Sequence, residues 1–149
     1  MILYLDTSAL VKQLVTEVGS STVDRFVATA QTVGTSIITR AEVAAALAKV
    51  VRVGGLRRDE ASTTLASFRS HWSTLVRLQV TEALIAKADA LAWEHNLRGY
   101  DAVHLASALF WQESLGEPVT LATLDVQLWR AGLPVGLSVW PEDLERFTR

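Results

Sequence analysis

The chain opens with the ten residues MILYLDTSAL (1–10), in which the apolar run Ile2–Leu5 is followed at once by Asp6. A short apolar run that ends at a polar residue is typical of a strand buried on both faces, as in a parallel sheet. A carboxylate directly after such a strand lies at its carboxyl end, which is where open α/β sheets bind their ligands. This stretch therefore predicts a fold class and also the place to search for function.

Beyond this stretch, short apolar runs alternate with longer segments of helical spacing. The expected strands comprise residues 2–5, 33–38, 75–80, 119–123 and 136–140. Apolar residues recur three and four positions apart in five other segments, which are residues 23–30, 43–51, 61–72, 85–92 and 102–109. This alternation predicts an α/β fold with a parallel sheet.

Length and composition indicate one globular domain. Residues 1–149 are 50% hydrophobic and 20% charged, which suits a single domain with a full core. The absence of cysteine excludes disulfides, thiolate catalysis and cysteine-ligated zinc, and it suits the cytoplasm. The first residues lack the basic region of a secretory signal, and no apolar stretch is long enough to span a membrane. We therefore expect a cytoplasmic protein with no membrane attachment.

Four carboxylates stand at the positions where such a fold binds ligands. Asp6 and Asp125 each follow a predicted strand directly, so we expect them at the same edge of the sheet. Glu42 lies in the first turn of the helix after the second strand. Asp101 begins the most apolar helix and shares a helical face with Leu105, so its side chain is expected to point towards packed protein.

Two interpretations of these acids remain open. Each acid taken alone fits a helix cap or a first-turn acid that complements the helix dipole. The set as a whole favours a cation site, because converging carboxylates repel one another and are costly to desolvate unless cations neutralise them. Oxygen ligands without cysteine favour Mg²⁺ or Mn²⁺ over zinc. Two such ions would activate a water and stabilise the leaving oxygen in phosphodiester hydrolysis.

Four segments together resemble the PIN domain, and most closely the VapC-type ribonuclease toxins of bacterial toxin-antitoxin pairs. The segments are residues 4–10, 39–43, 98–106 and 123–125, and the likeness extends over nearly the whole chain. The resemblance implies a three-layer α/β/α sandwich with a central parallel sheet. It also implies an Mg²⁺-dependent or Mn²⁺-dependent endoribonuclease that cleaves RNA, forms a homodimer and is blocked by a small antitoxin protein.

Position by position, the resemblance implies a metal-binding and catalytic set of four acids supported by two hydroxyl residues. The acids are Asp6, Glu42, Asp101 and Asp125, and the hydroxyl residues are Ser8 and Thr123. The first and third acids resemble the central metal ligands, the second completes or supports the site, and the fourth binds a second metal or acts through water. The two hydroxyls are suited to orienting a carboxylate or a metal-bound water.

Two other functional classes compete with the nuclease. A phosphoryl-transfer enzyme places a nucleophilic Asp at the end of its first strand, where Asp6 stands. A site like that of the haloacid dehalogenases requires a second Asp two residues later, and this position holds Ser8. A non-catalytic interaction or oligomerisation module of the same fold is the main alternative, although an inert copy would be free to lose acids that this chain retains.

Histidine and tryptophan residues admit a functional and a structural interpretation. His104 follows Asp101 by one helical turn and could complete a metal site, but a packed helical histidine is the favoured interpretation. The five tryptophans could stack on RNA bases, but core packing or a dimer interface explains them better.

The formal net charge of −2 departs from the basic surplus that is usual for nucleic-acid-binding proteins. RNA binding would then require the Lys and Arg residues to gather on one face. The densest basic cluster surrounds the Gly54-Gly55 turn and comprises Lys49, Arg52, Arg57 and Arg58. A solvated turn is the favoured interpretation of this cluster, and contacts with phosphates or with an acidic partner are the alternative.

Overall fold

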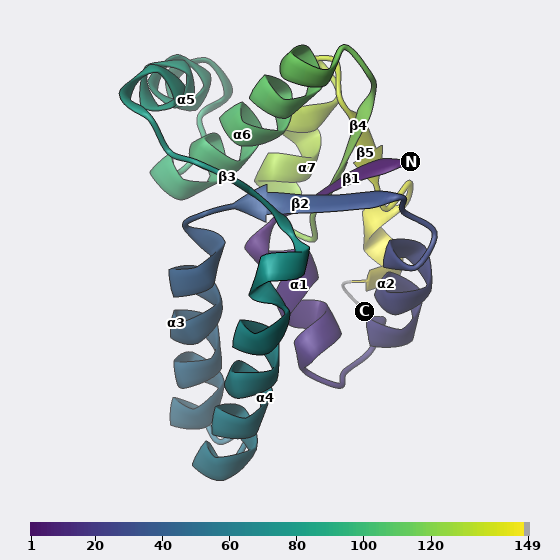
Figure 1. Cartoon of the computed structure of the whole chain (residues 1–149), viewed down its shortest axis with the longest axis vertical. Coiled ribbons are helices and arrows are strands. Elements are labelled where there is room, and N and C mark those ends of the chain that lie inside the picture. Colours follow the sequence, from purple (N-terminus) through teal and green to yellow (C-terminus); the bar gives the residue numbers. More distant parts are fainter. Residues whose placement is uncertain (148–149) are drawn as a thin grey trace.

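A parallel sheet lies at the centre of the molecule. The computed structural model describes residues 1–147, so residues 148 and 149 of the expected domain lie outside the described part. The described strands are β1 (Ile2–Leu5), β2 (Thr32–Ser36), β3 (Val76–Leu78), β4 (Val119–Ala122) and β5 (Ser138–Trp140). They lie in the order β3-β2-β1-β4-β5, and each neighbouring pair is parallel (Figure 1). The five predicted strands are thus confirmed, and those after the first are shorter than expected.

Alternation along β1 divides the core into two parts. Leu3 and Leu5 pack on one face of the sheet, whereas Tyr4 and Ile2 pack on the other. Leu3, Tyr4 and Leu5 are 0%, 0% and 1% exposed. Both faces of the central strand are therefore covered by protein, which is why the strand is apolar throughout.

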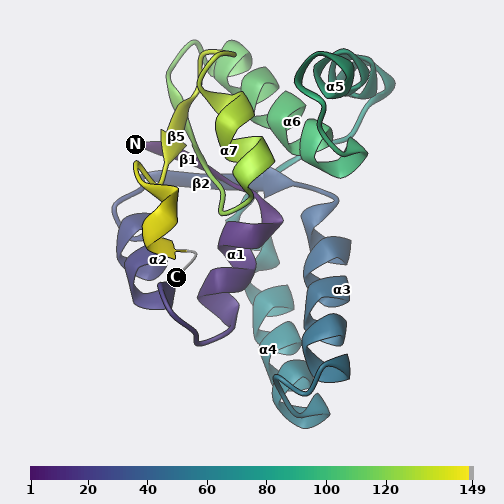
Figure 2. The ribbon, with the colours of Figure 1, turned by 180° about the vertical axis from the view of Figure 1, so that it is seen from behind.

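Helices cover the two faces of the sheet as outer layers (Figures 1 and 2). One layer comprises α1 (Thr7–Leu14), α2 (Ser20–Val27), α3 (Thr39–Arg52) and α4 (Arg58–His71). The other comprises α5 (Glu82–His95), α6 (Gly99–Leu115) and α7 (Val126–Gly132). Short 3₁₀ turns are formed by Trp72–Thr74 and Leu144–Phe147. The predicted three-layer α/β/α sandwich is confirmed.

The long α6 helix is the centre of its layer. Nine of its seventeen residues are buried, which accounts for the most apolar helical segment of the sequence. Trp111 of α6 and Trp72 are 6% and 5% exposed and pack in the core, as the structural interpretation of the tryptophans expects. Trp93 of α5 departs from that pattern, because it is 92% exposed. None of the helices in residues 1–147 is both long and apolar enough to cross a bilayer.

The strand order indicates where on the sheet a ligand would bind. From β1 the chain proceeds to β2 and β3 on one side, and it then crosses to β4 and β5 on the other. Ligands bind at such a reversal of strand order, outside the carboxyl ends of the strands. Two short helices, α1 and α7, start at this edge and were absent from the sequence prediction. These helices have eight and seven residues and bury only two and three of them, respectively.

We predict that Gly34→Ala destabilises the fold. A Cβ atom at Gly34 of β2 would lie 2.7 Å from two ring atoms of Trp111 and 3.2 Å from the Val76 carbonyl oxygen. Such overpacking costs about 1–3 kcal/mol of the free energy of unfolding, measurable by urea denaturation. Adding Trp111→Phe should recover part of the loss, because the smaller ring vacates the contact. Equal destabilisation by Gly34→Ala in the wild-type and Trp111→Phe backgrounds would contradict this account.

Candidate active site

Asp6 is held at the junction between β1 and β4. As the N-cap of α1 it accepts a hydrogen bond from the Ala9 amide at 2.9 Å. The Thr123 hydroxyl donates to its Oδ2 at 2.6 Å, and the Ser8 hydroxyl lies 2.7 and 2.9 Å from its two oxygens. The residue is only 3% exposed. Both hydroxyl residues singled out by sequence therefore contact this carboxylate directly.

Burial and hydrogen bonding act on the Asp6 carboxyl in opposite directions. Burial raises its pKa, while the nearby His104 and the donors from Thr123, Ala9 and Ser8 lower it. Burial is the larger effect, so the pKa of Asp6 lies above its ordinary value. A carboxylate in this state gains from a nearby cation, which favours its ionised form.

Asp125 stands beside Asp6 at the same edge. It is the N-cap of α7, and its Oδ1 accepts from the Leu128 amide at 2.9 Å. Its own amide donates to the Thr123 hydroxyl at 3.1 Å, so the Asp6 and Asp125 residues share Thr123 as a neighbour. The predicted convergence of these two acids is what the parallel pairing of β1 with β4 produces.

Asp101 lies in the first turn of α6, and Arg98 connects it to Asp125. The Nε atom of Arg98 donates to Asp101 Oδ2 at 2.8 Å, and its Nη2 atom donates to Asp125 Oδ2 at 2.9 Å. The two carboxylates raise the pKa of the guanidinium, Asp101 most strongly. Asp101 is not the cap of its helix, because Arg98 occupies that position without a side-chain cap. Sequence analysis did not single out Arg98.

Glu42 approaches the site from the other helical layer, at the start of α3. Its Oε1 accepts from the Thr7 hydroxyl at 2.7 Å and lies 2.6 Å from Nε2 of His104. Burial alone would raise the pKa of Glu42, but the hydrogen bond and charge of His104, together with Thr7 and Arg98, lower it. Glu42 is therefore stabilised as a carboxylate.

His104 is a buried link between Glu42 and the core. It is 2% exposed, and its Nδ1 lies 2.8 Å from the hydroxyl of the fully buried Tyr4. Because a carboxylate only accepts hydrogen bonds, Nε2 carries a proton and donates to Glu42; in a neutral ring, Nδ1 then accepts from Tyr4. The favoured interpretation of a packed helical histidine agrees with this burial. The contact with Glu42 required the folded arrangement, since the two residues lie on opposite layers.

A family model and two sequence relatives identify the family of this chain. The family model of the PIN domain matches residues 3–130. A protein described as Ribonuclease VapC49 of Mycobacterium tuberculosis is 34% identical over 145 residues, which cover 97% of this chain and 98% of that protein. Ribonuclease VapC3 of Pyrobaculum aerophilum is 38% identical over 128 residues, or 86% and 92% of the two chains. The chain belongs to the PIN-domain family.

The fold comparison agrees with this assignment. A solved structure described as a toxin-antitoxin complex from Klebsiella pneumoniae matches with a TM-score of 0.64 and 21% identity. The match covers 90% of this chain and 93% of that chain. At this identity the likeness concerns the fold alone, and it supports the three-layer arrangement of this PIN domain.

The donor chemistry of this PIN domain fits a hard divalent cation. All four acids offer carboxylate oxygens, and Asp101 and Asp125 already share one positive group, the Arg98 guanidinium. Within residues 1–147, however, no three His, Asp or Glu side chains are grouped as a ready-made metal site. Arg98 and His104 explain this arrangement, because they engage three of the four carboxylates. Coordination by the set would require these contacts to rearrange.

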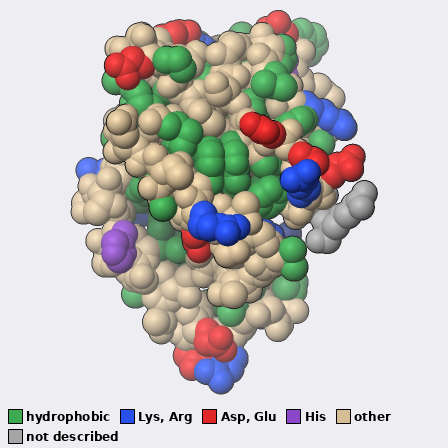
Figure 3. All heavy atoms as spheres, turned by 90° about the vertical axis from the view of Figure 1, so that its right-hand side faces the viewer, with side chains coloured by type: hydrophobic (Ala, Val, Ile, Leu, Met, Phe, Trp, Pro, Cys, Tyr) green, Lys and Arg blue, Asp and Glu red, His purple; other side chains and the backbone are tan. Residues whose placement is uncertain are grey.

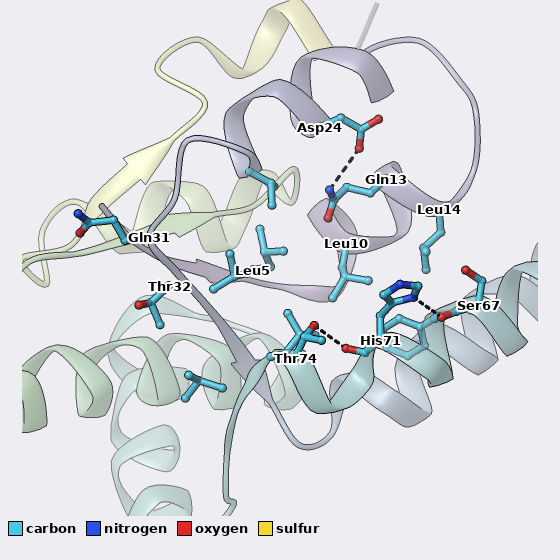
Figure 4. Close-up of a pocket in the computed structure, with 15 residues that line it drawn as sticks. Leu5, Leu10, Gln13, Leu14, Asp24, Gln31, Thr32, Ser67, His71 and Thr74 are labelled. Carbon is cyan, nitrogen blue, oxygen red and sulfur yellow. Dashed lines mark hydrogen bonds between the residues drawn. The ribbon is translucent and has the colours of Figure 1, made fainter.

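A pocket of about 560 Å³ in this PIN domain lies apart from the four acids. Figure 4 shows Leu10 and Leu14 of α1 facing this space, with the Gln13–Asp24 hydrogen bond at one side of it and His71 at another. None of the four acids lines it. The pocket is therefore a separate surface with a lining of both polar and apolar residues, and not the floor of the acidic site.

The basic cluster around Gly54-Gly55 lies at the end of α3 opposite to Glu42. Arg57 is paired there with Asp59 at 3.1 Å and with Glu60 at 3.0 Å. These pairs favour the solvated-turn interpretation. Figure 3 shows one face of the molecule, on which the described Lys and Arg side chains lie singly among Asp and Glu.

The raised pKa of Asp6 predicts a pH-dependent effect of Asp6→Asn on stability. Between the ordinary Asp pKa of about 3.9 and the higher folded value, the native state binds more protons than the unfolded state. Wild-type stability contributed by Asp6 therefore falls as pH rises through this range. In EDTA, we expect the Tm of Asp6→Asn to rise relative to the Tm of wild type as pH increases.

Glu42→Gln is the control of opposite sign. The pKa of Glu42 is lowered, so its stabilising contribution is present at neutral pH and is lost as pH falls. Glu42→Gln should consequently lose stability relative to wild type at neutral pH, and the deficit should shrink in acid. A Tm difference for Asp6→Asn that does not change with pH would contradict the burial effect on Asp6.

The Tyr4–His104 hydrogen bond predicts energetic coupling between β1 and α6. His104→Ala removes the partner of the buried Tyr4 hydroxyl and one of two partners of the part-buried Glu42 carboxylate, and it should cost about 1–3 kcal/mol of unfolding free energy. Because Tyr4→Phe removes that hydroxyl, the double variant should be less destabilised than the sum of the two single variants. His71→Ala, which alters an exposed histidine, provides the control and should be additive with Tyr4→Phe. Additivity of His104→Ala with Tyr4→Phe would exclude the link.

Proposed function

We propose that this PIN domain is a divalent-metal-dependent endoribonuclease, with Mg²⁺ or Mn²⁺ as the ion, and that it is the toxin of a toxin-antitoxin pair. The observation that carries the proposal is the placement of four acids at one edge of the sheet, two of which share a single cationic group. Relatives described as ribonucleases, similar over nearly the full length of the chain, support the reaction class.

In this proposal Asp6, Asp101, Glu42 and Asp125 hold the ions. When bound, the ions supply Lewis acidity, which activates a water for attack on the phosphodiester and offsets charge on the leaving oxygen. Thr123 and Ser8 orient the Asp6 carboxylate through the hydrogen bonds described above. His104 and Thr7 orient Glu42. The chain itself needs no side-chain nucleophile.

We further propose a small antitoxin protein and a second copy of this chain as partners, and the cytoplasm as the place of action. A similar solved structure described as a toxin-antitoxin complex supports the antitoxin. The pocket beside α1, which is lined by both polar and apolar residues, offers a surface for a segment of that partner. The exposure of Trp93 on α5 supports a self-association surface, since aromatic side chains are enriched at interfaces. The absence of cysteine suits a reducing compartment.

Cleavage of a mixed, structured RNA pool tests the function. Purified protein freed of co-purified inhibitor should cut RNA with Mg²⁺ or Mn²⁺ and not with a chelator. Asp6→Ala and Asp101→Asn should each lower the rate by at least about a hundredfold, because they remove ion ligands. Asp59→Asn alters an exposed acid outside the site and should cut at the wild-type rate.

The same experiment separates the nuclease from the interaction module. Metal-independent cutting, or full activity in Asp101→Asn, would overturn the metal-site assignment. Absence of cleavage together with absence of Mn²⁺ binding in a calorimetric titration would favour the non-catalytic module of the same fold.

A further inference from the structure

The forked side chain of Arg98 bridges two of the four acids. Its Nε and Nη2 atoms each donate to a different carboxylate, those of Asp101 and Asp125, at 2.8 and 2.9 Å. Among the described residues, these four acids form one further ion pair, between Glu42 and His104. Arg98 is thus the one permanently charged cation that the described residues bring to the site.

The two acids are more deeply buried than the arginine that bridges them. The Arg98 side chain is 77% exposed, while those of Asp101 and Asp125 are 13% and 24% exposed. Asp125 is also held as the cap of α7 by the Leu128 amide. The arginine end of both ion pairs faces solvent, so water can replace the carboxylates as the partner of the guanidinium. A divalent ion that binds the same carboxylate oxygens would displace Arg98 from them.

A displaced Arg98 stays at the first turn of α6. It is always charged, and it directly precedes Gly99, where an added Cβ would meet nothing within 4 Å. The first backbone amides of the seventeen-residue α6 have no acceptors within the helix. They lie at its N-terminus, which is the positive end of the helix dipole. An oxyanion there would meet open backbone and a guanidinium fork that matches phosphate geometry.

We propose that Arg98 alternates between two partners: it bridges Asp101 and Asp125 when no ion is bound, and it binds a phosphate of the RNA strand when ions displace it from those acids. The inference rests on the ribonuclease function proposed above and deepens it by naming the phosphate-binding residue. Arg98 is here a substrate-positioning residue, and ion binding is coupled to its release.

Mn²⁺ titration tests the first partner. By calorimetry, Arg98→Gln should bind Mn²⁺ more tightly than wild type, by up to about fivefold, because the ion no longer competes with one or two exposed ion pairs. Weaker or unchanged Mn²⁺ binding in Arg98→Gln would overturn the proposal, since it would mean that Arg98 assembles the acids or does not interact with them. Arg98→Lys, which keeps the charge and loses the fork, should fall between the two.

RNA binding tests the second partner. The probe is a pool of labelled 20-nucleotide single-stranded RNAs, titrated in Ca²⁺ at several salt concentrations. Arg98→Gln should bind about tenfold more weakly, as expected for a lost charged hydrogen bond. The slope of log K against log salt should fall by about 0.7, the value for one phosphate contact on a single strand. An unchanged slope would overturn the proposal, because a structural role of Arg98 would not alter the number of released ions.

Arg57→Gln is the matched control. Arg57 is also highly exposed and also bridges two acids, but it lies at the far end of α3 and α4. It should leave Mn²⁺ affinity and the salt slope unchanged. Wild-type cleavage with unaltered binding in Arg98→Gln would refute the Arg98 role and leave the nuclease intact. Absence of both Mn²⁺ binding and cleavage in wild type would refute the nuclease, and the Arg98 proposal with it.

Discussion

The hydrogen bond from Thr123 to the buried Asp6 carboxylate joins the ends of the two central strands. The two residues are 117 positions apart in the chain, and their oxygens are 2.6 Å apart in the fold. Burying a carboxylate is costly unless donors surround it, and Asp6 receives such donors from its own helix and from the loop after β4. The pairing of β1 with β4, the start of α1 and the geometry of the acidic edge all depend on this contact.

Capping and site formation are not alternatives in this protein. Asp6 and Asp125 each cap a helix with one carboxylate oxygen, and each keeps the other oxygen at the shared edge. Both roles fall on the same residues because the carboxyl end of a strand is also where the next helix begins. Asp101 is the exception, since it lies inside the first turn of α6 and its carboxylate pairs with Arg98.

The site also connects the three layers. Glu42 belongs to the helix that follows β2 on one face, and His104 belongs to α6 on the other. They meet at 2.6 Å beyond the edge of the sheet, and Tyr4 of β1 completes the chain of hydrogen bonds. A change in how either layer packs on the sheet would therefore alter the position of Glu42, even though no residue of the acidic set was touched.

The sequence by itself determined the strand positions, the α/β class and the candidate acids, because apolar periodicity and the residue after each strand are local properties. It failed for α1 and α7, short helices in which only two and three residues are buried. Only the tertiary structure decided which groups neutralise the acids. Arg98 reaches Asp125 across 27 positions, and His104 reaches Glu42 across 62. Such pairs depend on strand order and on layer packing, which no local pattern of residues encodes.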